Sequence, residues 1–515
     1  MQVQLQRSKP TLIEQFTNWL EASPSTLLIS ICVLYWFEIY FRIQTKAIWY
    51  DELFTLYVSQ LGGIDKLWAG LRAGIDNQPP LFYMITTAMH SVFTDQLWIV
   101  RMPQAIATFV TYIALYLLLR GRFGVIHSVS TILLMRLLGA QYYAAEGRPY
   151  ASVLAGATVA WLCYTRIDES KGMRALAWTC GMGLALAFCN AHHYYGGLAL
   201  APIAAAELVR TYDRGWRWAP WIALAASLAP YLVLLQFKDS LFGYKEGFPS
   251  KPSVSTFQQY WEGEAGQFTM RLFPLFIGVT LSSYWFAHFR TRKEEAETFP
   301  FERNEMVGIA VFCILPLIAL IAGKLITGLF VLRYAIPTLV GWALLFGMWL
   351  WRETHWNKPA TLSVFGFLLL MGFGIPFATK VMAQPENLWG EIIATLEKTE
   401  GDIVVEYGTS YLELYDAAPA TLKSRLVYLA NEELARANMG TDVFDRGLRR
   451  LGKSYPLRIA DTRLYCNTHS SFLILRTDNN QRGAMNAVAN QGRALYKKFK
   501  LPNHTLWRVE GTQQI

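Results

Sequence analysis

The chain has 515 residues, is 53% hydrophobic and only 17% charged, and has a mean hydropathy of +0.22, which excludes an ordinary soluble enzyme. Its net charge of +9 does not indicate a nucleic-acid partner. Much of that charge lies in loops between apolar segments, and basic loops of membrane proteins stay on the cytoplasmic side.

Apolar segments of about 15 to 22 residues recur up to about residue 380, and a helix of about 20 apolar residues crosses about 30 Å of hydrocarbon. The segments are 26–42, 102–119, 123–143, 150–165, 175–190, 195–209, 218–236, 271–289, 307–323, 331–351 and 361–379. No small-residue cleavage site follows the first, so we expect an uncleaved span. If each segment crosses once, the basic clusters share one face, which should be cytoplasmic. The sequence therefore predicts a polytopic all-α domain over residues 1–382, with about 11 transmembrane helices, in the inner (plasma) membrane.

The predicted first outer loop, residues 43–101, carries acidic residues at Asp51, Glu52 and Asp76. Carboxylates beside a span are candidates for proton transfer at the bilayer surface. The alternative for Asp51 is a helix N-cap, and for Asp76 a turn residue ahead of two prolines. The stretch 80–95 would span only ~22 Å as a helix, so we expect it to enter from outside without a full crossing.

The assignment of sides places three further polar clusters on the same outer face. Charged groups at membrane depth usually line a cavity, so we predict one shared outer cavity. The three clusters contain Glu146, Arg148 and Tyr150, then His192 and His193, and then Lys324, Arg333 and Tyr334.

Simpler alternatives exist for two of these clusters. Arg148 could be a snorkelling anchor at the membrane surface. His192 and His193 could be interfacial polar residues, because no His-x-x-x-His spacing or fixed Glu partner accompanies them. The six cysteines show no Cys-x-x-Cys spacing, so the sequence predicts neither a zinc ribbon nor a disulfide framework.

Two segments outside the spans complete the layout. Residues 238–270 are predicted to form a long outer loop, because they are rich in aromatic residues, glycine and charge, as is typical of lids and binding loops. Residues 383–515 are predicted to form a small extracytoplasmic α/β domain. Strands are expected at 402–407 and 472–475, and helical periodicity covers 429–452.

The outer-face residues indicate a reaction at a lipid phosphate. A carboxylate can accept the proton of an attacking hydroxyl, and arginines can neutralise a phosphate leaving group. The membrane location implies that one substrate is a lipid. The residue types alone do not require a sugar. A transporter or flippase for a polyprenyl-linked or anionic substrate is the alternative, and it would favour mid-span charges and inverted repeats.

The ordered motifs over residues 45–340 resemble the GT-C superfamily of membrane glycosyltransferases. The most similar branch is the bacterial one related to protein O-mannosyltransferases and lipid A aminoarabinose transferase. The matching motifs are Trp49-Tyr50-Asp51-Glu52, Asp76 ahead of Pro79-Pro80-Leu81-Phe82-Tyr83, Arg101-Met102-Pro103, Glu146-Gly147-Arg148-Pro149-Tyr150, and Arg333-Tyr334 followed by Pro337.

The resemblance implies a polyprenyl-phosphate-linked sugar donor, undecaprenyl-like in a bacterium. It implies that Asp51 is the general base of an inverting transfer and that Asp76 steadies the acceptor or a divalent cation. Arg333, Arg148 and Lys324 are the resulting candidates for the donor phosphate. In the aminoarabinose-type enzymes a Glu-Lys pair precedes the two prolines, whereas Asn77-Gln78 stands here, which puts a metal-dependent mechanism in doubt.

The remaining candidates complete the predicted extracytoplasmic site. Glu52 joins Asp51 and Asp76 in the catalytic set. The pocket candidates are Tyr83, Glu146, Tyr150, His192, His193 and Tyr334. The acceptor could be a glycan, a lipid such as lipid A, or a protein side chain, and the sequence does not choose among them.

Overall fold

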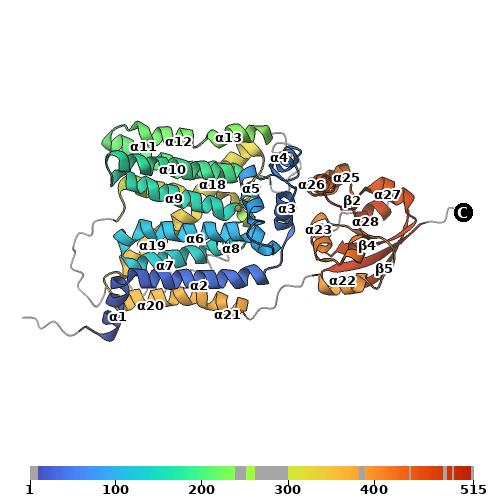
Figure 1. The fold of residues 1–515 in the computed structure, drawn as a ribbon, viewed down its shortest axis with the longest axis horizontal. Coiled ribbons are helices and arrows are strands. Elements are labelled where there is room, and N and C mark those ends of the chain that lie inside the picture. The colour runs from blue at the N-terminus through green and yellow to red at the C-terminus, as the bar shows by residue number, and fades with distance from the viewer. Residues whose placement is uncertain are drawn as a thin grey trace, which may run out of the picture.

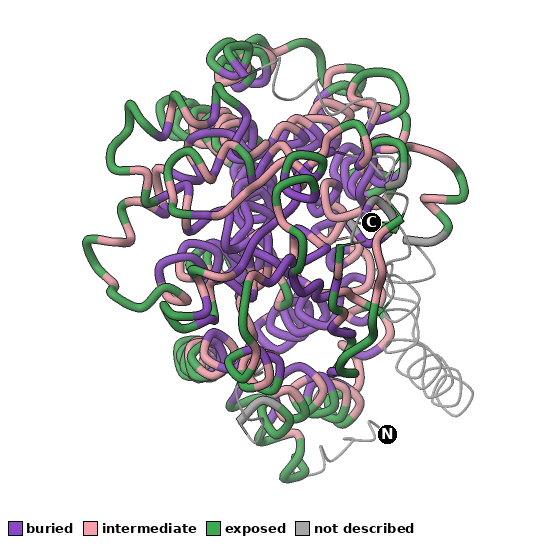
Figure 2. The backbone as a smooth tube through the Cα atoms, turned by 90° about the vertical axis from the view of Figure 1, so that its right-hand side faces the viewer, coloured by how far each residue is buried: buried purple, intermediate pink, exposed green. Residues whose placement is uncertain are grey.

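A computed structural model describes residues 10–237, 251–260, 300–381, 389–439, 442–478, 484–489 and 492–511. A bundle of long helices makes up one part of the molecule, and a smaller sheet-containing domain lies beyond one end of that bundle (Figure 1). Seen from the side of that domain, the buried backbone gathers in the middle of the molecule and exposed segments surround it (Figure 2).

The bundle contains helices from both ends of the membrane part of the chain. Its helices are α1 (Leu12–Ala22), α2 (Pro24–Thr45), α6 (Gln96–Phe123), α7 (Val125–Met135), α9 (Tyr150–Asp168), α10 (Gly172–His192), α11 (Leu200–Arg214), α12 (Trp218–Ala226), α13 (Ala229–Leu234), α17 (Arg303–Cys313), α18 (Leu315–Ala322), α19 (Thr338–Thr354), α20 (Lys358–Leu369) and α21 (Ile375–Val381). Helix α9 is almost entirely buried. It approaches α10 closely at Gly156, where an added Cβ would lie 2.5 Å from Cys189 Sγ.

Within the described residues, five helices are long and apolar enough to cross a membrane, or up to six if the bent pair α17–α18 counts as one span. The predicted number of 11 is not confirmed by this count and stays a prediction. One physical reason is that a π-helical turn at Arg136–Ala140 interrupts the predicted span 123–143 and leaves α7 with only 11 residues. The predicted span 271–289 lies outside the described residues, as does most of the predicted loop 238–270.

The predicted first outer loop folds into three short helices at the end of the bundle nearest the second domain (Figure 1). They are α3 (Tyr50–Ser59), α4 (Ile64–Arg72) and α5 (Pro80–Met89). Helix α5 has 10 residues and is about 15 Å long, so it does not cross a bilayer. This length agrees with the expectation for 80–95.

The C-terminal residues form a six-stranded mixed sheet in the order β3-β2-β1-β4-β6-β5. Strands β1 to β4 pair in parallel, and β6 and β5 add antiparallel. The strands are β1 (Ile403–Val405), β2 (Leu426–Ala430), β3 (Ile459–Asp461), β4 (Ser471–Thr477), β5 (Ala494–Leu501) and β6 (His504–Glu510). The helices are α22 (Gly390–Leu396), α23 (Gly408–Ala417), α24 (Ala420–Lys423), α25 (Glu432–Met439), α26 (Val443–Leu451), α27 (Thr462–Thr468) and α28 (Ala484–Ala489).

Strands β1 and β4 lie where the sequence predicts them, but the expected helical stretch 429–452 divides. Its first two residues belong to β2, and α25 and α26 follow. Strand β2 is buried along its whole length. A fully buried parallel strand is a continuous apolar run, which periodicity alone does not separate from a helix.

The helices of the first outer loop share one hydrophobic core with the C-terminal domain. Leu53, Phe54 and Leu71 from α3 and α4 pack in the same buried cluster as Leu412 and Leu448 from α23 and α26. The segment between α2 and α6 therefore packs as part of the C-terminal domain, although hundreds of residues separate this segment from that domain in sequence.

Candidate active site

A pocket of about 280 Å³ lies between the end of the helical bundle and the C-terminal domain. It is lined by Trp49, Tyr50, Asp51, Phe54, Ile75, Asp76, Asn77, Gln78, Arg148, Tyr150, Arg333, Tyr334, Thr409, Val443, Phe444 and Gly447. Six residues predicted for the site are among them: Asp51, Asp76, Arg148, Tyr150, Arg333 and Tyr334. The last four lining residues come from α23 and α26, so the C-terminal domain closes one side of the pocket.

Asp51 is the second residue of α3 and projects toward this pocket. The N-cap of α3 is Trp49, which makes no side-chain capping hydrogen bond, so the alternative that Asp51 is the N-cap is wrong. The Asp51 Oδ2 atom lies 3.8 Å from Arg148 Nε and 3.7 Å from Arg333 Nη2. Its side chain is 23% exposed, which leaves the carboxylate open to a ligand between two cations.

Asp76 is held by hydrogen bonds on both carboxylate oxygens. Oδ2 accepts from Arg148 Nη1 and from Tyr83 Oη, each at 2.6 Å, and Oδ1 accepts from the Asn77 backbone N–H at 2.7 Å. Burial alone would raise the pKa of Asp76, but the Arg148 guanidinium and these hydrogen bonds hold that pKa below its ordinary value. Asp76 is therefore an ionised anchor for Arg148.

The two arginines keep unused donors at the pocket. Neither Arg148 Nε nor Arg333 Nε has a hydrogen-bond partner in the described part of the chain, and both atoms are buried. The Arg333 guanidinium also lies over the Tyr150 ring at 5.4 Å. Buried donors of this kind normally find a partner, so these two favour an anionic ligand.

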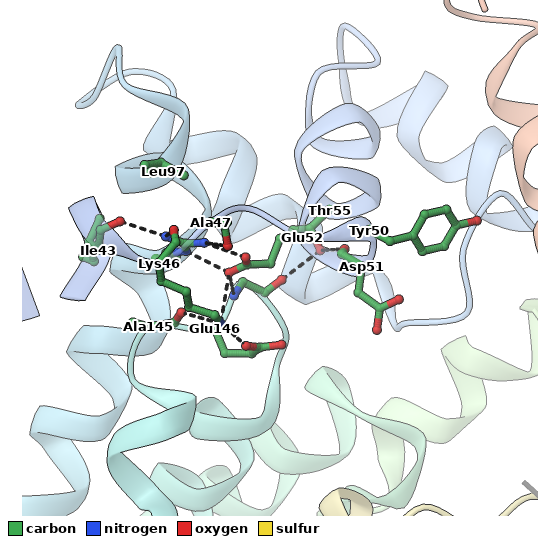
Figure 3. A network of polar contacts seen from close by, with 12 residues as sticks. Ile43, Lys46, Ala47, Tyr50, Asp51, Glu52, Thr55, Leu97, Ala145 and Glu146 are labelled. Carbon is green, nitrogen blue, oxygen red and sulfur yellow. Dashed lines mark hydrogen bonds and ion pairs between the residues drawn. The ribbon is translucent and has the colours of Figure 1, made fainter. Parts of the chain in front are cut away.

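Glu52 faces away from Asp51 and does not line the pocket (Figure 3). Its carboxylate accepts from Arg101 Nε at 2.9 Å, Arg101 Nη2 at 2.7 Å and the Gly147 backbone N–H at 2.7 Å. Burial would raise the pKa of Glu52, but Arg101 keeps it below its ordinary value. Gly147 has no room for a side chain, because a Cβ there would lie 1.9 Å from Val100. Glu52 supports the site from behind.

Glu146 belongs to the same supporting network. Lys46 Nζ pairs with Glu146 Oε2, donates to the Ala145 carbonyl at 3.0 Å and lies 3.9 Å from Glu52 Oε1 (Figure 3). Burial raises the pKa of Glu146 despite the nearby Lys46. The loop that carries Arg148 is thereby tied to the start of the first outer loop.

The remaining predicted residues lie beside or outside the pocket. His193 packs against the rings of Tyr334 at 4.7 Å and Tyr150 at 5.7 Å, and its Nδ1 accepts from the Tyr195 backbone N–H. His192 is buried, with Nδ1 2.9 Å from the Phe188 carbonyl. Lys324 is exposed in a π-helical turn and is not among the lining residues.

The structure adds residues that the sequence did not single out for the site. Lys46 supports the acidic loop together with Arg101, which the sequence indicated only as part of a motif and without a role in the site, and Thr409, Val443 and Phe444 close the pocket. No spacing signal links the last three to Asp51, because they lie in another domain. In the described residues no group of three or more His, Cys, Asp or Glu side chains could hold a metal ion.

Comparisons with known proteins agree with this architecture. A family model for dolichyl-phosphate-mannose-protein mannosyltransferases matches residues 77–236. No curated protein matches the chain in sequence. The fold is similar to the crystal structure of ArnT from Cupriavidus metallidurans bound to undecaprenyl phosphate, with a TM-score of 0.58, 13% identity, and coverage of 94% of this chain and 98% of that one.

The same enzyme in the apo state aligns at a TM-score of 0.46 and 13% identity, over 96% of this chain and 98% of that one. The family match and the shared fold confirm the resemblance to GT-C membrane glycosyltransferases.

Proposed function

We propose that this chain transfers a sugar from a polyprenyl-phosphate donor to an acceptor hydroxyl on the extracytoplasmic face of the membrane. The observation that carries the proposal is the position of the Asp51 carboxylate between Arg148 and Arg333 in one pocket. The mannosyltransferase-family match over 77–236 and the ArnT-like fold support a lipid-phosphate-linked donor.

In this proposal Asp51 is the general base. It accepts the proton of the acceptor hydroxyl while the acceptor oxygen bonds to the anomeric carbon of the sugar. The bond from that carbon to the phosphate oxygen breaks, and polyprenyl phosphate leaves. A single displacement of this kind inverts the anomeric configuration.

Arg148 and Arg333 hold the phosphate and neutralise the charge that develops on it as it leaves. Their buried Nε donors have no hydrogen-bond partner in the described residues. A guanidinium group can bind phosphate through two parallel N–H···O hydrogen bonds. Asp76 keeps Arg148 in place through the 2.6 Å bond to Nη1. The aromatic walls, Tyr150 and Tyr334 among them, suit the faces of a sugar ring.

The distribution of charge supports an extracytoplasmic pocket. Arg122, Arg166 and Arg214 lie in the last turns of α6, α9 and α11, whose C-terminal ends are at the end of the bundle away from the C-terminal domain (Figure 1). Because basic loops remain cytoplasmic, the opposite end, with Asp51 and the C-terminal domain, is assigned to the outside.

The proposal is tested with the purified chain in lipid nanodiscs, radiolabelled undecaprenyl-phosphate sugars and a cell-envelope extract as the source of acceptor hydroxyls. The wild type should release undecaprenyl phosphate, and Asp51→Asn should lose nearly all turnover while folding normally. Asp65→Asn, an exposed acid in the same outer loop, is the matched control and should keep wild-type turnover. In sealed proteoliposomes, movement of the labelled lipid between leaflets without release of lipid phosphate would instead identify a flippase.

A further inference from the structure

The C-terminal domain holds helix α3 at both ends through polar contacts. Glu413 Oε1 accepts a hydrogen bond from the Tyr50 backbone N–H at 3.0 Å. At the other end, Asp416 Oδ1 accepts from Tyr57 Oη at 3.1 Å, and Tyr455 Oη donates to the Tyr57 carbonyl at 2.5 Å. These contacts fix the axis of the helix that carries Asp51.

The geometry of α23 explains how one helix reaches both positions. Glu413 and Asp416 are three residues apart, so they project from the same face of α23. Tyr50 and Tyr57 are seven residues apart, which places them two turns apart on one face of α3. Two side chains of α23 therefore contact α3 at two separated points.

The Glu413 contact supplies a cap that α3 itself lacks. The first N–H groups of an α-helix have no partner within the helix, and a side chain at the N-cap usually accepts from one of them. Here the N-cap, Trp49, makes no side-chain capping bond. Glu413 instead reaches across from the C-terminal domain, and its carboxyl oxygen accepts a hydrogen bond from the N–H of Tyr50.

We propose that Glu413 is a positioning residue. Its carboxyl group, from the C-terminal domain of the same chain, caps the N-terminus of α3 and thereby fixes Asp51 in the pocket. The importance of this role rests on the proposed function, since Asp51 is the general base there. The C-terminal domain then contributes to catalysis indirectly, because it contacts α3, the helix that carries the general base Asp51.

The surroundings of Glu413 make this cap sensitive to pH. Burial, together with the charge of Asp51 on α3, raises the pKa of Glu413 to about 7, against the opposing effect of the Tyr50 N–H. The other titratable groups nearby are Tyr407 at the start of α23, against which the apolar Phe444 of α26 packs, and Asp416 one turn further along α23.

The direction of the pH effect follows from the sign of this shift. A carboxyl with a raised pKa binds its proton more tightly in the native arrangement than when released, so the arrangement weakens as pH rises through 7. The ionised Glu413 and Asp51 then repel each other. We expect the start of α3 to open more readily above neutral pH.

Hydrogen–deuterium exchange of the full chain in nanodiscs tests the proposal without depending on catalysis. Glu413→Ala should speed exchange of the amides at 50–54 about tenfold, because a helix cap is lost. Glu413→Gln keeps the acceptor oxygen but does not ionise, so it should retain protection and lose the dependence on pH around 7. Asp478→Asn, an acid elsewhere in the same domain, should behave as wild type.

Activity provides the second measurement. Glu413→Ala should lower kcat about tenfold, and Glu413→Gln should restore most of it with a flatter pH profile above 7. Unchanged protection of 50–54 in Glu413→Ala, or a wild-type pH dependence in Glu413→Gln, would overturn the positioning role. If exchange changes as expected but the wild type releases no lipid phosphate, the proposed function fails and the capping role stands.

Discussion

Arg101 and Glu52 form an ion pair in which both side chains are fully buried, with contacts of 2.9 Å and 2.7 Å. Arg101 also donates to the carbonyls of Ile43, Lys46 and Ala47. All five N–H donors of the guanidinium are thereby used. The pair joins the end of α2 to α3 and α6, directly behind Asp51.

Removing Arg101 should destabilise the protein more than it directly affects the chemistry. A buried carboxylate left without its partner costs about 3–5 kcal/mol. We therefore expect Arg101→Met to lower the thermal unfolding temperature markedly, and Arg101→Met with Glu52→Gln to recover part of the loss because position 52 no longer carries a buried carboxylate without its partner. Arg303→Met breaks an exposed pair with Asp213 and should change stability by less than about 1 kcal/mol. Equal effects of Arg101→Met and Arg303→Met would contradict this account.

Arg333 is predicted to act on the donor. Its side chain is 32% exposed and keeps a buried, unused Nε in the described structure, so it can bind a phosphate oxygen. Losing a charge-assisted hydrogen bond costs about 1.5–3 kcal/mol, so Arg333→Gln should raise the KM for the lipid-linked sugar roughly 10- to 100-fold. Arg333→Lys should recover only part, because it keeps the charge and loses the planar fork. Arg352→Gln, an exposed arginine at the end of α19, is the control. A KM for Arg333→Gln equal to that of the wild type would remove Arg333 from the donor site.

Asp76 is predicted to act through Arg148. In Asp76→Asn the neutral side chain no longer balances the charge of the Arg148 guanidinium. Arg148 should then move toward Asp51 and form an ion pair with it, so that the carboxylate is no longer free to accept a proton. We expect kcat to fall about 100-fold, while binding of undecaprenyl phosphate, measured by microscale thermophoresis, weakens less because Arg333 still contacts the phosphate. Tyr83→Phe removes one hydrogen bond to Asp76 and should cost only about 1 kcal/mol, or roughly fivefold in kcat. The idea fails if Asp76→Asn abolishes donor binding instead.

The sequence predicts the gross architecture because its strongest signals are local. Apolar segments predict a helical membrane bundle, and buried strands such as β1 are short apolar runs between turn residues. The break in the span that contains Arg136–Ala140 is not predicted, because a π-helical turn leaves the apolar run uninterrupted. The number of crossings therefore stays a prediction.

The same reasoning predicts only some of the residues of the site. Asp51, Asp76, Arg148 and Arg333 lie around one pocket, as expected from charges gathered on one face, and their catalytic roles stay predictions. Glu52 adjoins Asp51 in sequence, yet successive helix residues point in directions about 100° apart, so one faces the pocket and the other faces Arg101. Phe444 and Glu413 give no local signal, because their relation to the site depends on how the two domains pack.

Gly447 offers a direct test of that packing. A Cβ at this position would lie 3.2 Å from the Phe54 ring and 3.6 Å from the Ile75 carbonyl, so α26 approaches α3 and the Asp76 loop closely. The neighbouring Arg450 donates to the Gly74 carbonyl at 2.7 Å. Valine at 447 should force α26 away from α3 and open the pocket.

We expect Gly447→Val to lower kcat at least tenfold and to speed proteolysis between the two domains, with the C-terminal sheet still folded. Gly366→Val is the matched control, because a Cβ there meets nothing within 4 Å and the site is remote. If Gly447→Val kept full turnover, the C-terminal domain would not need to seat on α3 for catalysis. A loss of turnover with an intact sheet would instead show that closure by α26 is part of the working site.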